Sequence, residues 1–302
     1  MYSWRVDLDH YWSVLKDAIL AITSDQEGLF TTEIKGLSFY RQTTSEKAQQ
    51  PHFCQPIILL ILQGTKTLVV AQQTYSYPEK TAIFCGMDMP VTSCIAQASS
   101  DAPYLALTLA LDFNYLAEFI GSVPQYKEEI QSFLQTYPLD LHLLDTFVRL
   151  VDLSQNYDAT LTNLVLKELY YRLLKSPFGS TLCALTKLGS QENQIAQAIN
   201  WLKANFAKPI AIEELAKIVH MAPSTFYKHF KTLTGVTPLQ YIKRLRLNEA
   251  HRLLMLDGNL SQAAKQVGYD SLSQFIREYK RLYGNSPKRN LKILSAMENI
   301  KI

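Results

Sequence analysis

Two short stretches of the sequence carry side chains of the types that contact nucleic acids. Tyr227 and Lys228 lie in the first stretch, and Ser273, Gln274 and Arg277 lie in the second. Arginine can donate two hydrogen bonds to a guanine edge, and glutamine can pair with adenine. Lysine mostly contacts phosphate. The neighbouring cations Lys231, Lys280 and Arg281 are expected to make such phosphate contacts. These types and spacings favour contact with a polyanion.

The two stretches belong to an internal repeat. "HFKTLTGVTP" at 229–238 is matched 49 residues later by "EYKRLYGNSP" at 278–287. A repeat of this size indicates one supersecondary unit used twice. The matched positions are Phe230 with Tyr279, Lys231 with Lys280, Leu233 with Leu282, Gly235 with Gly284 and Pro238 with Pro287.

Apolar spacing predicts two short helices in each copy. In the first, Phe226, Phe230 and Leu233 fall at i, i+4 and i+7, after a short helix whose apolar face is Leu215, Ala216 and Val219. Pro223 suits the first turn of the second helix, with Ser224 or a preceding residue as its cap, and Gly235 suits its end. In the second copy Ala264 and Gly268 precede buried Phe275, Tyr279 and Leu282, with a turn one residue longer. Two such helices form a helix-turn-helix, whose second helix enters the major groove of DNA.

The segment between the copies predicts one connecting helix. Thr237 caps it, Pro238 lies in its first turn and Gly258 ends it. About 20 helical residues span ~30 Å, close to the ~34 Å between successive major grooves on one face of DNA. Its cations are expected to be part structural and part phosphate-facing: Lys243, Arg244, Arg246 and Arg252.

Charge divides the chain in the same place. Residues 191–302 hold 17 basic and 8 acidic side chains, whereas residues 1–190 hold 13 and 19. Only the basic half is expected to meet a polyanion. The sequence contains no apolar run of membrane-spanning length, its N-terminus reads as an amphipathic helix and not a signal peptide, and its four cysteines form no CxxC, so a cytoplasmic location is expected.

Apolar residues in the N-terminal half follow a strand-like pattern and not the helical spacing of the C-terminal half. Short β-branched and aromatic segments from about 35 to 111 predict strands of a small barrel or sandwich, with a hairpin at 62–67 around Gly64. Farther on, the sequence predicts a helix that is capped by Thr160 or Thr162 and carries an apolar stripe. This stripe either covers the barrel or packs against a second copy of the chain. Its members are Leu161, Leu164, Val165, Leu169 and Leu173. The linker is expected within 185–193, where apolar periodicity lapses.

Residues from about 192 to 290 resemble the DNA-binding domain of AraC/XylS transcription regulators, through "RLRLNEAHRLL" and "AAKQVGYDSLSQFIREYKRLYGNSP". The resemblance implies that Ser224, Thr225, Tyr227 and Lys228 face bases from the first copy, and Ser273, Gln274 and Arg277 from the second. Three positions depart from the family's pattern. His220 stands where a turn glycine is common, Tyr279 replaces a usual Phe, and Gln274 takes a position that is often aromatic.

The front half resembles the N-terminal domain of one AraC branch, through "LILQGTKTLVV", "YSYPE" and "DMPVTSCIAQASSDAPYLALTLALD". The resemblance implies a cupin-like barrel that senses a small molecule, with helices that mediate dimerisation. The expected fold is therefore α+β in two domains: a barrel at 1–188, an all-α double helix-turn-helix at 189–290, and a tail at 291–302.

Catalysis and metal binding are not expected. Only His52 lies in the strand region, without the cluster of ligands that a metal-dependent cupin needs, and no nucleophile elbow or phosphate loop is present. The residues expected to meet an effector are His52, Cys54, Tyr75 and Cys85. Free cysteines are usually small buried hydrophobes, but Cys54, two residues from His52, is the best placed to react.

The sequence thus predicts a transcription regulator, in the first instance an activator controlled by a small-molecule effector, and not an enzyme. Its expected partners are double-stranded DNA, an effector, RNA polymerase and a second copy of the chain, with no membrane and no cofactor. In the alternative, the N-terminal domain only dimerises, or it senses electrophiles or oxidants through a cysteine.

Overall fold

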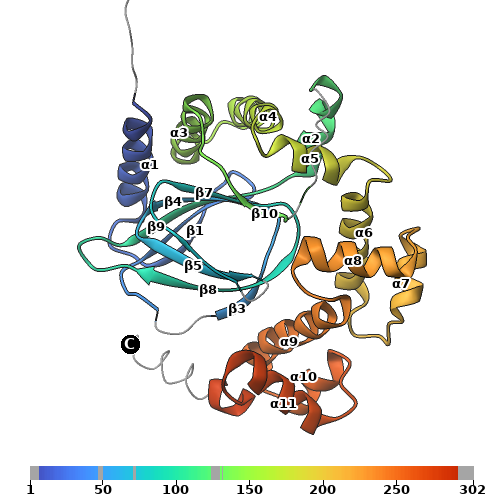
Figure 1. The fold of residues 1–302 in the computed structure, drawn as a ribbon. Coiled ribbons are helices and arrows are strands. Elements are labelled where there is room, and N and C mark those ends of the chain that lie inside the picture. The colour runs from blue at the N-terminus through green and yellow to red at the C-terminus, as the bar shows by residue number, and fades with distance from the viewer. Residues whose placement is uncertain (1–6, 47–49, 71–72, 124–129, 131, 292–302) are drawn as a thin grey trace, which may run out of the picture. The chain divides into compact units, whose positions relative to one another are not determined.

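The computed structural model describes residues 7–46, 50–70, 73–123, 130 and 132–291. They form two compact units: an N-terminal one that ends at Asn193, and a C-terminal one that begins at Gln194 and also includes Gln50–Phe53 and Pro90–Thr92. The N-terminal unit consists of strands with helices against them, and the described residues of the chain from Gln194 onward form only helices and their connections (Figure 1). The predicted α+β organisation is confirmed.

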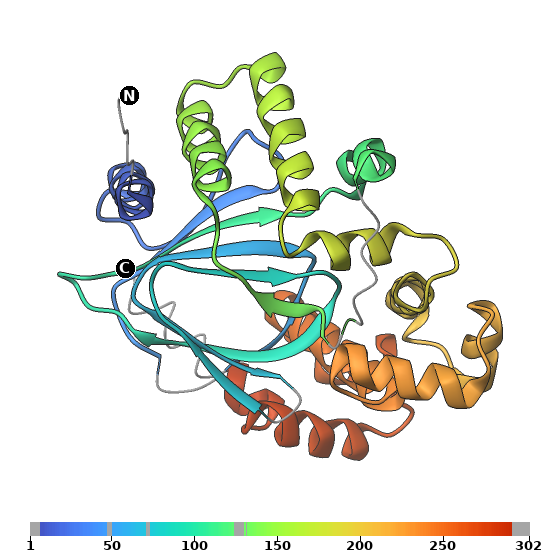
Figure 2. The same cartoon turned by 45° about the horizontal axis from the view of Figure 1, so that its top comes forward.

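The strands of the N-terminal unit form two sheets that make a small barrel (Figures 1 and 2). Within the described residues, the larger sheet has the order β1-β2-β9-β4-β7-β10 and the smaller one β3-β8-β5-β6. The strands are β1 (Gly28–Thr31), β2 (Leu37–Gln42), β3 (Gln50–Cys54), β4 (Ile57–Gln63), β5 (Thr65–Val70), β6 (Gln73–Tyr77), β7 (Thr81–Cys85), β8 (Met89–Gln97), β9 (Tyr104–Ala110) and β10 (Leu134–Thr136).

Helices cover the outer face of the larger sheet. Alternate residues of β4 face opposite ways: Ile58 and Leu60 share an apolar cluster with Phe147 of a covering helix, while Ile61 joins Tyr104 in the barrel interior. A strand buried on both faces has an almost continuously apolar sequence. The helices and the 3-10 turn among the described residues of this unit are α1 (Leu8–Thr23), α2 (Phe113–Phe119), η1 (Ile120–Ser122), α3 (Leu141–Gln155), α4 (Ala159–Lys175) and α5 (Gly179–Thr186).

Aspartate residues begin four of these helices. The side chains of Asp7, Asp112, Asp140 and Asp158 each accept a backbone N–H from the first turn of α1, α2, α3 and α4, respectively. A cap of this kind satisfies a donor that the helix itself leaves unpaired. The predicted cap of α4 at Thr160 or Thr162 is therefore wrong, because the cap, Asp158, lies two or four residues before these positions.

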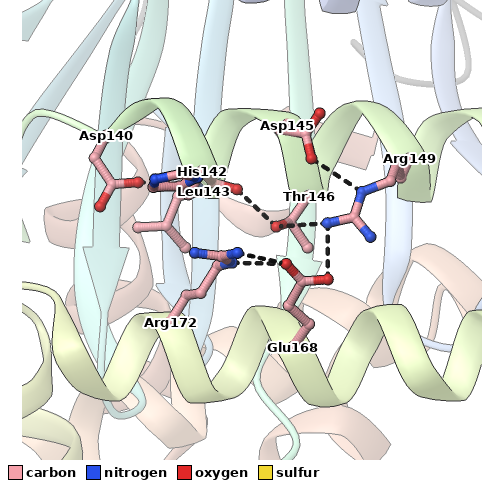
Figure 3. A network of polar contacts seen from close by, with 8 residues as sticks. All are labelled: Asp140, His142, Leu143, Asp145, Thr146, Arg149, Glu168 and Arg172. Carbon is pink, nitrogen blue, oxygen red and sulfur yellow. Dashed lines mark hydrogen bonds and ion pairs between the residues drawn. The ribbon is translucent and has the colours of Figure 1, made fainter.

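A polar network joins α3 to α4 (Figure 3). The Arg149 guanidinium lies 3.0 Å from the Asp145 carboxylate and 2.8 Å from that of Glu168, and Arg172 lies 2.7 Å from Glu168. Burial alone would raise the pKa of the Glu168 carboxyl, but hydrogen bonds and charge from Arg149 and Arg172 lower it below its usual value. The network holds the register of the two helices at the surface of the unit.

Gly64 turns a corner between the sheets. The predicted hairpin at 62–67 is wrong, because β4 and β5 lie in different sheets and do not pair. The position nevertheless requires glycine, as expected. Gly64 has φ +83°, and a Cβ there would lie 2.6 Å from the Gln97 carbonyl oxygen. The local sequence shows the bend but not the sheet to which the next strand belongs.

The apolar stripe predicted on α4 is only partly buried. Leu169 and Leu173 lie in the core, whereas Leu161 and Leu164 are 52% and 57% exposed. Leu166 and Tyr170 are buried in their place, on a face turned slightly around the helix. The first half of α4 therefore presents leucines to solvent.

Two helical hairpins and a connecting helix form most of the C-terminal unit. Gly235, Gly258 and Gly284 end α8, α9 and α11 in the left-handed conformation, as the sequence predicts. The capping box of Thr237 and Gln240 begins α9. The helices are α6 (Gln191–Asn205), α7 (Ile212–Ile218), α8 (Pro223–Thr234), α9 (Pro238–Asp257), α10 (Leu260–Gln266) and α11 (Leu272–Tyr283).

Arg246 ties this unit together from the middle of α9. Its guanidinium donates to the carbonyl oxygens of Phe206 at 2.7 Å, Gly268 at 2.9 Å and Lys208 at 2.9 Å. The loop between α6 and α7 is thereby bound to the turn between α10 and α11. Arg246 therefore has a structural role, one of the two roles that the sequence left open for the cations of α9.

Replacing Arg246 with alanine is expected to destabilise the C-terminal unit by about 2–4 kcal/mol, because three carbonyls lose a charged donor. Arg246→Lys should recover only part of this loss, since an ammonium cannot reproduce the planar fork. Thermal unfolding of the two variants and of Arg252→Ala, a change on an exposed face of the same helix, measures the effect. Equal stability of the Arg246→Ala and Arg252→Ala proteins would contradict the structural role.

Candidate nucleic-acid interface

The first helix-turn-helix consists of α7 and α8. Phe226, Phe230 and Leu233 are buried as predicted, which turns the opposite face of α8 to solvent. On that face Ser224, Tyr227, Lys228 and Lys231 are exposed and Thr225 is half-buried. Ala222 precedes α8 without a side-chain cap, and Pro223 takes the first helical position. Of the caps that the sequence left open, Ser224 is wrong, because a preceding residue, Ala222, takes the N-cap position; the Ser224 hydroxyl is left at the surface.

The turn of this first copy contains a strained residue. His220 has φ 56°, whereas its counterpart in the second copy, Gly268, has φ 87°. The left-handed conformation costs a residue with a Cβ about 1–2 kcal/mol relative to glycine. The departure from glycine at 220 thus keeps the turn geometry at a cost in stability.

The second helix-turn-helix consists of α10 and α11. The Ser271 side chain accepts the N–H of Gln274, and Phe275 and Tyr279 are buried. The exposed face carries the predicted contact residues Ser273, Gln274, Arg277, Lys280 and Arg281. The turn from 267 to 271 is one residue longer than the turn from 219 to 222, as expected.

Glu278 is a residue of this face that the sequence interpretation missed. Its carboxylate accepts from the Tyr269 hydroxyl at 2.8 Å, from the Gln274 amide at 3.2 Å and from the Lys243 ammonium at 3.1 Å. Burial would raise its pKa, but these three donors lower it. Its spacing of four residues from Gln274 was the available signal. The bond to Glu278 uses one of the two Gln274 amide hydrogens, which leaves the second hydrogen and the amide oxygen for a base.

The contacts of the Tyr279 hydroxyl account for the tyrosine at this position, where the family usually has phenylalanine. Its hydroxyl lies 2.6 Å from His251 Nδ1 on α9, and Tyr283 stacks on the same imidazole with ring centroids 4.6 Å apart. Burial lowers the pKa of His251. The added hydroxyl of Tyr279 therefore has a partly buried partner, which a phenylalanine would not need.

Lowering the pH from about 7.5 to about 5.5 is expected to destabilise the C-terminal unit through His251. The unfolded chain protonates this imidazole near pH ~6.5, and the folded chain only at lower pH, so stability is lost as the pH falls through this window. Thermal unfolding at both pH values measures the loss, and His251→Gln should reduce it. The same pH dependence in the variant would assign the effect to another group.

Two segments of the chain match known protein families. Residues 33–181 match the family described as "AraC-type transcriptional regulator N-terminus", and residues 215–292 match a "Helix-turn-helix domain" family. The chain belongs to the AraC family of transcription regulators. It is a DNA-binding regulator with an activator among its relatives, VirF.

The relatives differ in how much of the chain they cover. LumQ of Photobacterium leiognathi, a probable transcriptional regulator, is 40% identical over 91 residues, which are 30% of this chain and 37% of LumQ. VirF of Yersinia enterocolitica, a virulence regulon transcriptional activator, is 26% identical over 244 residues, which are 77% of this chain and 87% of VirF. A crystal structure of ToxT from Vibrio cholerae has a TM-score of 0.57 at 14% identity, covering 84% of this chain and 97% of that one, and shows the same two-domain fold.

In this AraC regulator the four residues expected to meet an effector are not all in one place. Cys54 at the end of β3 and Cys85 at the end of β7 lie together, and the Cys85 thiol is 3.8 Å from the Cys54 carbonyl oxygen. His52 is a half-buried residue of β3. Tyr75 on β6 is 40% exposed, stacks on Tyr77 and bonds to Gln73. The two cysteines are thus the pair that the fold brings into contact.

Two hollows of the N-terminal unit lie apart from these residues. A groove of about 400 Å³ between α1 and α3 has mostly apolar walls that include Leu15 and Val151. A hollow of about 610 Å³ lies over one end of the barrel, around Gly64 and Gln97. Among the residues that the structure describes, no helix is long and apolar enough to cross a membrane, and no group of three metal-ligand side chains is found.

Proposed function

We propose that this protein is a sequence-specific transcription activator that places α8 and α11 in successive major grooves of its operator. The observation that supports the proposal most is the pair of exposed polar and basic faces, each backed by the same buried aromatic pattern. The 20-residue α9 connects the two helices, and such a helix is ~30 Å long, near the groove repeat. Activation by contact with RNA polymerase in the cytoplasm is part of the proposal and follows the activators among its relatives.

The test is a selection of genomic DNA fragments with the purified full-length protein, followed by footprinting. The expected result is two protected patches about one helical turn apart. A single protected patch would contradict the proposal that α8 and α11 of one chain each contact a major groove. No enrichment at moderate salt, with or without extracts of small molecules, would contradict specific DNA binding.

A small-molecule effector in the N-terminal barrel is proposed to control this binding. ToxT, which shares the fold, has been solved with an unsaturated fatty acid bound, so this fold has room for a small ligand. An effector that binds the folded barrel must raise its unfolding temperature. Thermal scans of the full-length protein against a metabolite library measure this shift. If no compound shifts the transition of the N-terminal unit, its role is dimerisation or thiol chemistry.

A second copy of the chain is proposed to pack on α4. Tyr157, Leu161 and Leu164 are each about half exposed along or beside the first half of this helix. Leu161→Ser with Leu164→Ser is expected to shift the protein from dimer to monomer in sedimentation. Leu188→Ser, at a leucine that is 85% exposed outside α4, is the matched control. A dimer unaffected by the double change would place the interface elsewhere.

A further inference from the structure

Cys54 and Cys85 are brought together by the two sheets of the barrel. Cys54 ends β3 of the smaller sheet and Cys85 ends β7 of the larger one. Ile57, three residues after Cys54, is the cross-strand partner of Cys85. The Cys85 thiol lies 3.8 Å from the Cys54 carbonyl oxygen and 3.1 Å from that of Met87.

The two thiols differ in access. Cys85 is fully buried, whereas Cys54 is partly exposed. An accessible thiol with a buried neighbour is the arrangement of redox-sensitive pairs, in which the outer sulfur is oxidised and the inner one resolves it. Both cysteines are free in this structure.

The charges around the pair favour the same division of roles. Interaction with the Cys85 thiol lowers the pKa of the Cys54 thiol against the effect of burial, with help from Lys66 on β5 and opposition from Asp88. The same interaction and burial raise the pKa of the Cys85 thiol well above its usual value. Cys54 is therefore the more acidic of the two thiols, and nucleophilic attack requires the thiolate.

We propose that Cys54 and Cys85 form a peroxide-sensitive thiol pair whose disulfide locks β3 to β7 and changes DNA binding. The Cys54 thiolate attacks a peroxide oxygen, the O–O bond breaks, and Cys54 becomes a sulfenic acid with release of water. The Cys85 sulfur then attacks the Cys54 sulfur, and a second water leaves. Two thiols are oxidised to one disulfide, and one hydrogen peroxide is reduced to two waters. The effect on DNA rests on the proposed function; the thiol chemistry does not.

The first measurement needs no variant. The reduced full-length protein is treated with stoichiometric hydrogen peroxide, alkylated with iodoacetamide, digested without reductant and analysed by mass spectrometry. The expected product is a crosslink between the Cys54 and Cys85 peptides, lighter by two hydrogens than the two thiol peptides. Full alkylation of both cysteines, or oxidation confined to Cys94 or Cys183, would overturn the proposal.

Variants separate the two roles. Cys54→Ser is expected to abolish the reaction, whereas Cys85→Ala should stop at a sulfenic acid on Cys54 that dimedone traps. Cys94→Ala and Cys183→Ala are the matched controls and should keep the crosslink. Lys66→Gln should slow alkylation of Cys54 severalfold at neutral pH, and Lys66→Arg should not. Equal rates in all proteins would show that Lys66 does not support the thiolate.

Binding of the selected operator by reduced and peroxide-treated protein tests the regulatory step. A change of about tenfold in Kd, reversed by dithiothreitol and absent in Cys54→Ser, is expected. An unchanged Kd with a complete crosslink would overturn the regulatory step and leave DNA binding intact. Failure of the reduced protein to bind any DNA would instead contradict the proposed function, whatever the state of the thiols.

Discussion

Gly268→Ala is expected to destabilise the C-terminal unit by more than ~3 kcal/mol, whereas Gly284→Ala should cost only about 1–2 kcal/mol. Both glycines have positive φ, +87° and +76° respectively, so both changes meet the same backbone strain. A Cβ at 268 would also lie 2.2 Å from the Ala207 carbonyl oxygen, while a Cβ at 284 meets nothing within 4 Å. The pair therefore separates steric conflict from strain.

The Ala207 loop is not free to move away. Arg246 binds the carbonyl oxygens of Phe206 and Lys208 on either side of it, and that of Gly268 itself. Relieving the conflict must stretch or break these hydrogen bonds. Gly268→Ala combined with Arg246→Ala should then cost less than the sum of the two single changes, since both disrupt one contact.

Calorimetry of the full-length variants measures these effects, provided that the transition of the N-terminal unit serves as an internal reference. That transition should stay unchanged in both glycine variants. Equal losses at 268 and 284 would show that the Ala207 loop yields to the new methyl group. A loss of stability in Gly284→Ala alone would contradict the close approach of residue 268 to the Ala207 carbonyl oxygen.

Local patterns in the sequence were enough to predict the two helix-turn-helix motifs. The spacing of Phe226, Phe230 and Leu233, and of Phe275 and Tyr279, fixes which face of each helix is buried, and the terminal glycines fix where each helix ends. Each of these signals acts within a few residues of chain. The same spacing predicted the exposed faces on which the contact residues lie.

Contacts between distant segments were not visible in the same way. The role of Arg246 depends on carbonyl groups of residues 206, 208 and 268, and any residue type supplies a carbonyl. The corner at Gly64 reads as a hairpin because a tight bend has the same composition whether or not the next strand joins the same sheet. Leu161 and Leu164 show that an apolar residue on a helical stripe need not be buried in the chain that carries it.

Short edge strands escaped prediction for a related reason. β1, β3 and β10 have four, five and three residues and few β-branched side chains. Their pairing with longer strands stabilises them, and their own sequence contributes little. The contact between Cys54 and Cys85 depends on where β3 lies, so the strand pattern alone could not place the two thiols together.

The double change Lys228→Ala with Arg277→Ala is expected to have the largest effect on DNA binding, because it removes one side chain expected to contact bases from each helix-turn-helix. Both side chains are exposed, and neither forms an ion pair with any residue that the structure describes. Loss of a base contact by Arg277 should cost ~1–3 kcal/mol and relax the sequence preference. Lys243→Ala is the matched control, because Lys243 is already paired with Glu278.

The salt dependence separates base reading from charge. Lys231→Ala and Lys280→Ala remove charges proposed to lie against phosphate, so they should weaken all sequences alike and reduce the slope of log K against log salt by ~1 each. Arg277→Ala should instead weaken the operator more than random DNA. Competition binding at several salt concentrations measures both quantities. If Arg277→Ala behaves like Lys280→Ala, α11 binds the backbone, and sequence selection then rests on α8 alone.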